Sequence, residues 1–275
     1  MDGGRFISYG QTGEDAVLLR VFGDRPTGCW IDVGANHPVL DSVTKNFYDM
    51  GWRGINIEPI VSLYEALRRE RPEDVNILAA IAEEPGELTF FRNDTHLGLS
   101  TFDARWAEQY RERGDAIEPV PVRVTTLPAI CEDHLAGRTI DFLKIDTEGH
   151  ELTVIDGHDF ERFPATVLLA ESGYKRDEIT KRLAAVGMRF TLFDGTNCWY
   201  VAENAPAEIA DRLDHAADAV LDGFHPYVYV NELMKAQGEI HALNAEIAAL
   251  RRRSLRANLG RVRRYARRLG GRASS

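Results

Sequence analysis

The sequence has few cysteines, no long apolar run and no acidic residue at its C-terminal end. Cys29, Cys131 and Cys198 are far apart and form no CxxC pair, which opposes a disulfide framework or a structural zinc site and makes a reducing cytoplasm the expected location. No run approaches the ~18 apolar residues that a bilayer-spanning helix needs. The N-terminus also lacks the basic-then-apolar pattern of a signal peptide.

The absence of acid at one end divides the chain into two parts of opposite charge. The formal net charge is −10. Residues 251–275 contain ten arginines and no acidic residue, whereas residues 1–250 carry 23 basic and 43 acidic side chains. The acidic body disfavours binding to a nucleic-acid backbone. The basic tail indicates a segment that attaches the protein to a partner or a surface.

Short apolar runs alternate with amphipathic segments along most of the chain. Helices are expected over 11–22, 41–50, 61–71, 151–157 and 176–187. Strands are expected over 29–35, 54–57, 75–82, 87–91, 120–127, 139–146 and 165–172, followed by a hairpin at 189–203. This order predicts an α/β fold with a doubly wound, mostly parallel sheet whose last edge is antiparallel. The less regular stretch from 92 to 119 is expected to form a lid.

A turn of small residues follows the strand at 29–35, in the segment IDVGANHP. Gly34 lets the backbone approach a ligand closely, and Ala35 is nearly as small. A strand, a tight turn and a helix N-terminus together direct backbone N–H groups toward a bound molecule. The segment lacks the GxGxxG glycines that a dinucleotide pyrophosphate usually requires, so a ligand without pyrophosphate is favoured.

Two acidic residues end later strands. Glu58 closes INIEP, 24 residues after Gly34, where a carboxylate can accept hydrogen bonds from the two hydroxyls of a ribose. Asp146 ends the buried strand of FLKIDTEGHE, at the carboxyl edge where open α/β sheets bind ligands. Either acid alone is compatible with a solvated strand end. Together with the Gly34 turn they favour an adenosine-containing ligand.

Four separated segments resemble the FkbM family of S-adenosylmethionine-dependent methyltransferases. They are YGQTGEDAVL, IDVGANHPVLDSVTKNFYDMGWRGINIEP, LSTFD and FLKIDTEGHE, in the family's order over roughly residues 8–203. The resemblance implies a class I methyltransferase (Rossmann-like) fold with a seven-stranded sheet. The organisation we expect is an N-terminal cap helix at 1–27, the methyltransferase domain at 28–203, a helical extension at 204–230 and a coiled-coil and Arg-rich tail at 231–275.

The resemblance also implies which residues bind the cofactor S-adenosyl-L-methionine. The positions that match the turn around its methionine part are Asp32, Gly34, Ala35 and Asn36. The positions that match the ribose acid, the adenine flank and the acid near the methionine amino group or the acceptor are Glu58, Ala80 with Ile81, and Asp146. The N-terminal motif contributes Gln11, Glu14 and Asp15, which are expected to close over the cofactor.

Methyl transfer to a hydroxyl requires a group that accepts the hydroxyl proton. The candidate catalytic residues are Asp146, Glu148 and His150, with His37 as a further candidate base. No metal is expected. The alternative is a magnesium site formed by Asp146, Glu148 and Glu171, which would orient and acidify a hydroxyl.

The function we predict is O-methylation of a sugar hydroxyl in a glycan or glycolipid, a preference that depends on the tail and on family analogy. The enzyme alternative is a macrolide or other secondary-metabolite O-methyltransferase. Trp106 and Tyr110 would suit stacking on either acceptor, or would form one packed face of a helix. Two alternatives from other classes are a non-catalytic adenosine-binding scaffold and a nucleotide-binding oxidoreductase, which the missing glycines oppose.

The C-terminal segment carries apolar residues at heptad spacing. They are Leu233, Ala236, Ile240, Leu243, Ile247 and Leu250. This pattern predicts a short coiled coil and a homodimer. The alternatives are an amphipathic basic helix that lies on anionic lipid at the inner face of the membrane, a disordered solubilising tail, and nucleic-acid binding. The last ranks lowest because Tyr265 is the only aromatic in the Arg-rich tail.

Overall fold

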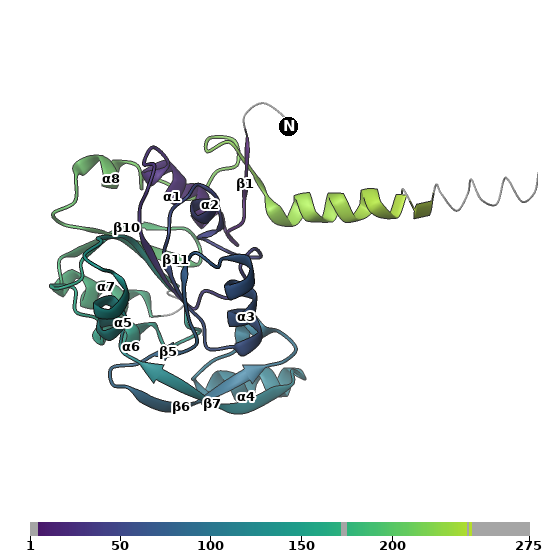
Figure 1. Ribbon diagram of the computed structural model, residues 1–275, viewed down its shortest axis with the longest axis horizontal. Coiled ribbons are helices and arrows are strands. Elements are labelled where there is room, and N and C mark those ends of the chain that lie inside the picture. Colours follow the sequence, from purple (N-terminus) through teal and green to yellow (C-terminus); the bar gives the residue numbers. More distant parts are fainter. Residues whose placement is uncertain (1–4, 172–174, 241, 244–275) are drawn as a thin grey trace, which may run out of the picture. The chain divides into compact units, whose positions relative to one another are not determined.

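The computed structural model describes residues 5–171, 175–240 and 242–243, and the chain divides into two compact units, residues 1–226 and 227–275. The first unit is a mixed α/β domain built on a seven-stranded sheet of order β10-β11-β9-β8-β2-β3-β4 (Figure 1). The strands are β10 (Met188–Phe193), β11 (Asn197–Ala202), β9 (Ala165–Glu171), β8 (Ile140–Ile145), β2 (Trp30–Val33), β3 (Ile55–Ile57) and β4 (Val75–Ile77).

The sheet is mostly parallel. Strands β9, β8, β2, β3 and β4 pair in parallel, and β11 pairs antiparallel with both β9 and β10. The last strand of this sheet in sequence, β11, is therefore antiparallel, as predicted. It does not form the edge, because the hairpin folds back so that β10 lies outside it and runs parallel to the other five.

Alternating side chains divide the sheet into two buried faces, because successive residues of a strand point to opposite sides. Ile31 and Leu143 pack on one face with α5 (Leu127–His134), α6 (Glu151–Asp156) and α7 (Arg176–Ala185). Trp30 and Phe142 pack on the other face with α1 (Glu14–Phe22), α2 (Lys45–Asp49) and α8 (Ala207–Asp211). The central strands β2 and β8 are buried along their whole length, which explains why most of their residues are apolar.

The run at 75–82 is not one strand. It divides into β4, which joins the large sheet, and β5 (Ala80–Ile81), which pairs with β7 (Ile117–Thr125) in a separate three-stranded sheet of order β5-β7-β6. The chain turns where the Ala79 N–H donates to the Ile77 carbonyl at 3.2 Å. No glycine or proline marks this turn, so the sequence prediction of a single strand was wrong.

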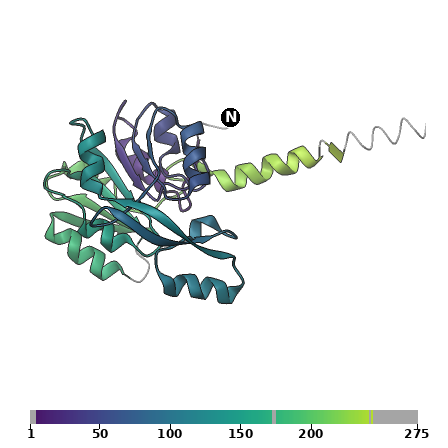
Figure 2. The same ribbon diagram turned by 60° about the horizontal axis from the view of Figure 1, so that its bottom comes forward.

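The stretch expected to be a lid is largely regular. It begins at the end of β6 (Gly86–Asn93), which confirms the strand predicted at 87–91 and pairs antiparallel with β7. The connection between β6 and β7 holds a 3₁₀ turn (Leu97–Leu99) and helix α4 (Ala104–Arg113). Figures 1 and 2 both show α4 beside β6 and β7. Helix α4 begins at Asp103, whose side chain accepts the Arg105 N–H, and ends at Gly114. Ala107 is its one fully buried residue, and Trp106 and Tyr110 beside it are half-buried.

Two further strands were not predicted. Strand β1 (Phe6–Ser8) pairs in parallel with β12 (Phe224–Pro226), which joins the two ends of the first unit. The segment expected to be a helical extension thus contains the short α8 and a strand. Helix α3 (Val61–Glu70) matches its prediction and buries Leu63 and Leu67.

The second unit begins with a helix over 227–240, and residues 242–243 are also helical. The coiled-coil prediction at 244–250 and the Arg-rich tail lie outside the described residues. Among the helices that the structure describes, none combines the length and apolar character needed to cross a membrane.

Candidate functional site

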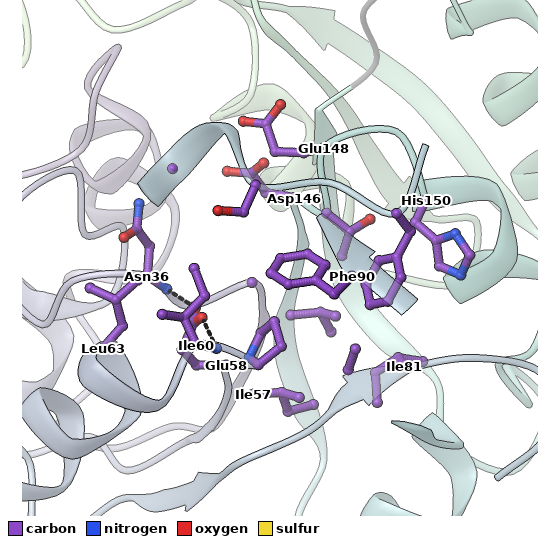
Figure 3. A pocket seen from close by; sticks show the side chains of 18 of the residues that line it. Asn36, Ile57, Glu58, Ile60, Leu63, Ile81, Phe90, Asp146, Glu148 and His150 are labelled. Atoms are coloured by element: carbon purple, nitrogen blue, oxygen red, sulfur yellow. Dashed lines mark hydrogen bonds between the residues drawn. The ribbon is translucent and has the colours of Figure 1, made fainter. Parts of the chain in front are cut away.

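A cleft lies at the carboxyl ends of β2, β3 and β8, next to β5 and β6 (Figure 3). Its apolar wall comes from Ile57, Ile60, Leu63, Ile81 and Phe90. The polar side chains that line it are Asn36, Glu58, Ser100, Asp146, Thr147, Glu148 and His150. In Figure 3, Asp146 and Glu148 lie across the cleft from Ile57 and Ile81.

The Gly34 turn brings β2 against the end of β8. Gly34 has φ 81°, and a Cβ built on it would lie 1.9 Å from the backbone oxygen of Asp146. The Gly34 N–H donates to the Ile57 carbonyl at 3.0 Å. Asn36 follows with φ 53°, a left-handed conformation that asparagine tolerates better than most residues. The turn thus fixes three strand ends at one point of the cleft.

Glu58 is held by this turn. Its carboxylate accepts the Asn36 N–H at 2.8 Å and the Ile60 N–H at 2.7 Å, one on each oxygen. Burial raises the pKa of Glu58 to about 7, against the two N–H donors and Lys144, which lower it. Each carboxylate oxygen has a second lone pair, so Glu58 keeps hydrogen-bonding capacity for a ligand beside the apolar wall.

Lys144 is a site residue that the sequence reasoning missed. It pairs with Asp32 across β2 and β8, and its Nζ lies 3.3 Å from carboxylate oxygens of both Asp32 and Asp146. It also donates to the Gly34 carbonyl at 3.1 Å. Burial lowers the pKa of Lys144, but the charges of Asp32 and Asp146 outweigh burial and hold that pKa above its ordinary value. Lys144 therefore stays cationic and fixes the orientation of Asp146.

Asp146, Glu148 and Glu171 form an acidic cluster. One oxygen of each lies within 4.8 Å of the others. Burial, followed by the charge of Asp146, raises the pKa of Glu148 to about 9 and that of Glu171 to about 8. Like charges this close favour protonation or an added cation. The cluster offers oxygen ligands for magnesium, but Lys144 already supplies a positive charge to Asp146.

The LSTFD segment (residues 99–103) contacts the loop after β8 that carries Glu148 and His150. The Thr101 hydroxyl donates to the Glu148 carbonyl at 2.6 Å, which supports Glu148 in a left-handed conformation of φ 51°. The Phe102 and His150 rings contact each other, with centroids 5.0 Å apart. Nε2 of His150 is buried, and no group in the described ranges forms a hydrogen bond with it. Burial and then Lys175 lower the pKa of His150, so this imidazole is neutral at pH 7 and can accept a proton.

An aromatic pair lies near the acidic cluster. Trp106 and Tyr110 of α4 stack with centroids 6.1 Å apart and planes inclined by 26°. A Cβ built on Gly149 would lie 3.8 Å from Trp106. Burial and then the charge of Glu148 raise the pKa of Tyr110. Both rings are half-buried, so the pair is at once a packed face of α4 and partly exposed.

Several predicted site residues do not line the cleft. Asp32 and Ala35 are buried behind it, so Asp32 acts through Lys144. Gln11 is exposed and away from the lining. Asp15, which is buried, accepts the Tyr9 N–H at 2.7 Å and fixes its own segment. Nδ1 of His37 accepts backbone N–H groups within its own loop.

The remaining predicted residues come together. Those that line the cleft are Gly34, Asn36, Glu58, Ala80, Ile81, Asp146, Glu148 and His150. The apolar residues Ile60, Leu63 and Phe90 were missed, and only their helix or strand patterns could have indicated them. Lys144 was also missed, although a charged residue inside the otherwise apolar FLKID strand is itself a signal.

Comparison with known proteins gives one family. The model of the methyltransferase FkbM domain matches residues 32–214. No curated protein sequence gave a match.

Proposed function

Because the chain belongs to the FkbM methyltransferase family, we propose that it transfers a methyl group from S-adenosylmethionine to a sugar hydroxyl of a glycan or glycolipid. The single observation that supports this best is the cleft, which joins the Gly34 turn, the buried Glu58 and an acidic cluster at one sheet edge. The strand order, with antiparallel β11 next to the edge strand, supports a class I methyltransferase fold.

The residues of the cleft fit the cofactor. Glu58 would accept hydrogen bonds from the ribose hydroxyls, and Ile60, Leu63 and Phe90 would cover an apolar ring such as adenine. Gly34 and Asp146 line the cleft side by side, where the methionine part would lie. When bound, S-adenosylmethionine supplies an electrophilic methyl group on a sulfonium.

The acidic cluster is the proposed site of proton removal. A carboxylate with a raised pKa is a stronger base once it is ionised, and Glu148 faces the cleft. Glu148 would accept the hydroxyl proton, while Lys144 holds Asp146 in position to orient the hydroxyl. His150 is the alternative proton acceptor, since its buried Nε2 has no partner among the described residues.

The sugar preference is supported by the aromatic pair. Sugar rings present C–H faces that stack on aromatic rings and hydroxyls that donate to carboxylates. Trp106 and Tyr110 lie near the acidic Glu148, so one acceptor could contact both. Trp106→Ala should raise KM for a sugar acceptor without changing S-adenosylmethionine affinity. Equal KM values for the two proteins would remove Trp106 from the acceptor site.

Calorimetry with S-adenosylmethionine, S-adenosylhomocysteine and NAD tests the cofactor. We expect the first two to bind and NAD not to bind. Glu58→Gln places an amide N–H₂ against one of two backbone N–H donors and removes a charged acceptor. It should therefore weaken binding by about 1–3 kcal/mol, or roughly 5- to 150-fold in Kd. Preference for NAD would refute the methyltransferase assignment.

Asp74→Asn is the matched control. Asp74 is also buried, and it accepts the Gly54 N–H at 3.0 Å. It directly precedes β4, so it lies at the amino ends of the strands, away from the cleft. It should destabilise the fold in a similar way and leave cofactor affinity unchanged. If both variants lose affinity equally, the effect of Glu58 on binding is indirect.

A further inference from the structure

The helix of the second unit exposes a continuous apolar seam. Tyr229, Leu233, Ile240 and Leu243 have exposed fractions of 58–67%, and Ala236, which lies between them, is also exposed. Their spacing is 4-3-4-3 residues, the heptad pattern of a coiled coil. In sequence, Ile247 and Leu250 continue this spacing. Tyr229 adds one position before Leu233, where the heptad pattern of the sequence analysis began, so the pattern covers three heptads.

The residue types along the seam favour two parallel strands. In the heptad register, position a holds Leu233, Ile240 and Ile247, and position d holds Tyr229, Ala236, Leu243 and Leu250. β-branched residues at a combined with leucine at d are typical of parallel dimers.

The flanking charges favour the same orientation. Position g is glutamate in each heptad, at residues 232, 239 and 246, and the facing e positions 237, 244 and 251 are Gln, Asn and Arg. A parallel pair sets each glutamate against one of these uncharged or basic residues. An antiparallel pair would set glutamate against glutamate, which is repulsive.

We propose that this seam binds the same seam of a second copy of the chain, so that the protein is a parallel homodimer joined through residues 229–250. An isolated helix with such a seam leaves large apolar side chains in water, and pairing removes them from it. Attachment to lipid would instead use the basic residues beyond 250, which the seam does not include.

Sedimentation of the full chain over a wide concentration range tests the proposal. We expect a dimer, and we expect Ile240→Glu to convert it to a monomer because two carboxylates would face each other in the seam. Met234→Glu is the matched control. Met234 is equally exposed at 65% but lies off the seam, so this variant should remain dimeric. Unchanged cofactor binding by all three proteins would show that the first unit is intact.

The orientation has its own readout. Ala236→Cys should form an intermolecular disulfide on mild oxidation, because d positions of parallel partners face each other, whereas Met234→Cys should not. The three native cysteines are buried. Three outcomes would overturn the proposal: the chain is a monomer, the Ile240→Glu variant remains a dimer, or the Ala236→Cys dimer forms no cross-link. Monomers that float with anionic vesicles would favour the membrane instead.

Discussion

Gly34→Ala isolates the close approach of two chain segments beneath the cleft. Gly34 has φ 81°, and its added Cβ would lie 1.9 Å from the Asp146 backbone oxygen. Gly187 provides the matched control, since it has φ 77° and nothing lies within 4 Å of a Cβ built on it. Both substitutions carry the same left-handed backbone cost, and only one adds a clash with main-chain atoms.

The expected magnitudes follow from these two terms. A left-handed alanine costs about 1–2 kcal/mol, and this is the whole effect expected for Gly187→Ala. Real Cβ atoms essentially never approach closer than 3.0 Å, so Gly34→Ala forces the two segments apart by about 1 Å. Overpacking of this kind costs about 1–3 kcal/mol more. A displacement of about 1 Å also lowers a catalytic rate by about 100-fold.

Denaturant unfolding measures the free energy of unfolding of both variants, and calorimetry with S-adenosylhomocysteine measures their binding. Gly34→Ala should be the less stable by about 1–3 kcal/mol and should bind more weakly, whereas Gly187→Ala should bind normally. Equal stability and equal affinity of the two variants would refute the argument from the Gly34 contact.

Three further outcomes follow from the charged groups of the cleft. If Glu148 accepts the hydroxyl proton, kcat/KM should rise with pH toward the Glu148 pKa of about 9. The variant Glu148→Gln should lower kcat by about 10²–10⁴-fold. A kcat/KM profile that is already flat above pH 7 would assign the proton to His150. The folded protein without ligand holds protons on Glu148 and Glu171 that the unfolded chain has released, so its free energy of unfolding should fall from pH 7 to pH 9. Thermal melts of Glu148→Gln should show a smaller fall, and an equal fall would place those protons elsewhere. Since the Lys144 ammonium already lies 3.3 Å from Asp146, methyl transfer should continue in excess chelator, and activity that is lost and then restored by magnesium would establish a metal site.

Sequence patterns predicted the large sheet well, because its central strands are buried on both faces and consist mostly of apolar residues. The division of 75–82 was not predictable in this way. Both halves are apolar, and the second half leaves the sheet because it pairs with β7, a segment some forty residues away in sequence. Helix α4 was expected only as an alternative, through the spacing of Trp106 and Tyr110, because most of its residues are polar and Ala107 is its one fully buried residue.

For the cleft, position at a strand end was the useful signal. Glu58 and Asp146 follow apolar runs directly, and parallel strands bring such ends to one edge. Asp32 lies within β2 and points to a buried face, which strand parity could have indicated. Glu171 also ends an apolar run, and its predicted position beside Asp146 and Glu148 is confirmed. The role of Lys144 depends on the register between β2 and β8, which no single segment contains.

The pairing of β1 with β12 has a mechanical consequence. The strands are parallel, with Phe6 opposite Phe224 and Ser8 opposite Pro226. A force that pulls on the N-terminus and on the chain beyond Pro226 therefore acts at opposite ends of the pair, and its hydrogen bonds are loaded together in shear rather than opened one at a time. The family match at 32–214 includes neither strand. The pairing of β1 with β12 therefore resists a force that would pull the two ends of the first unit apart.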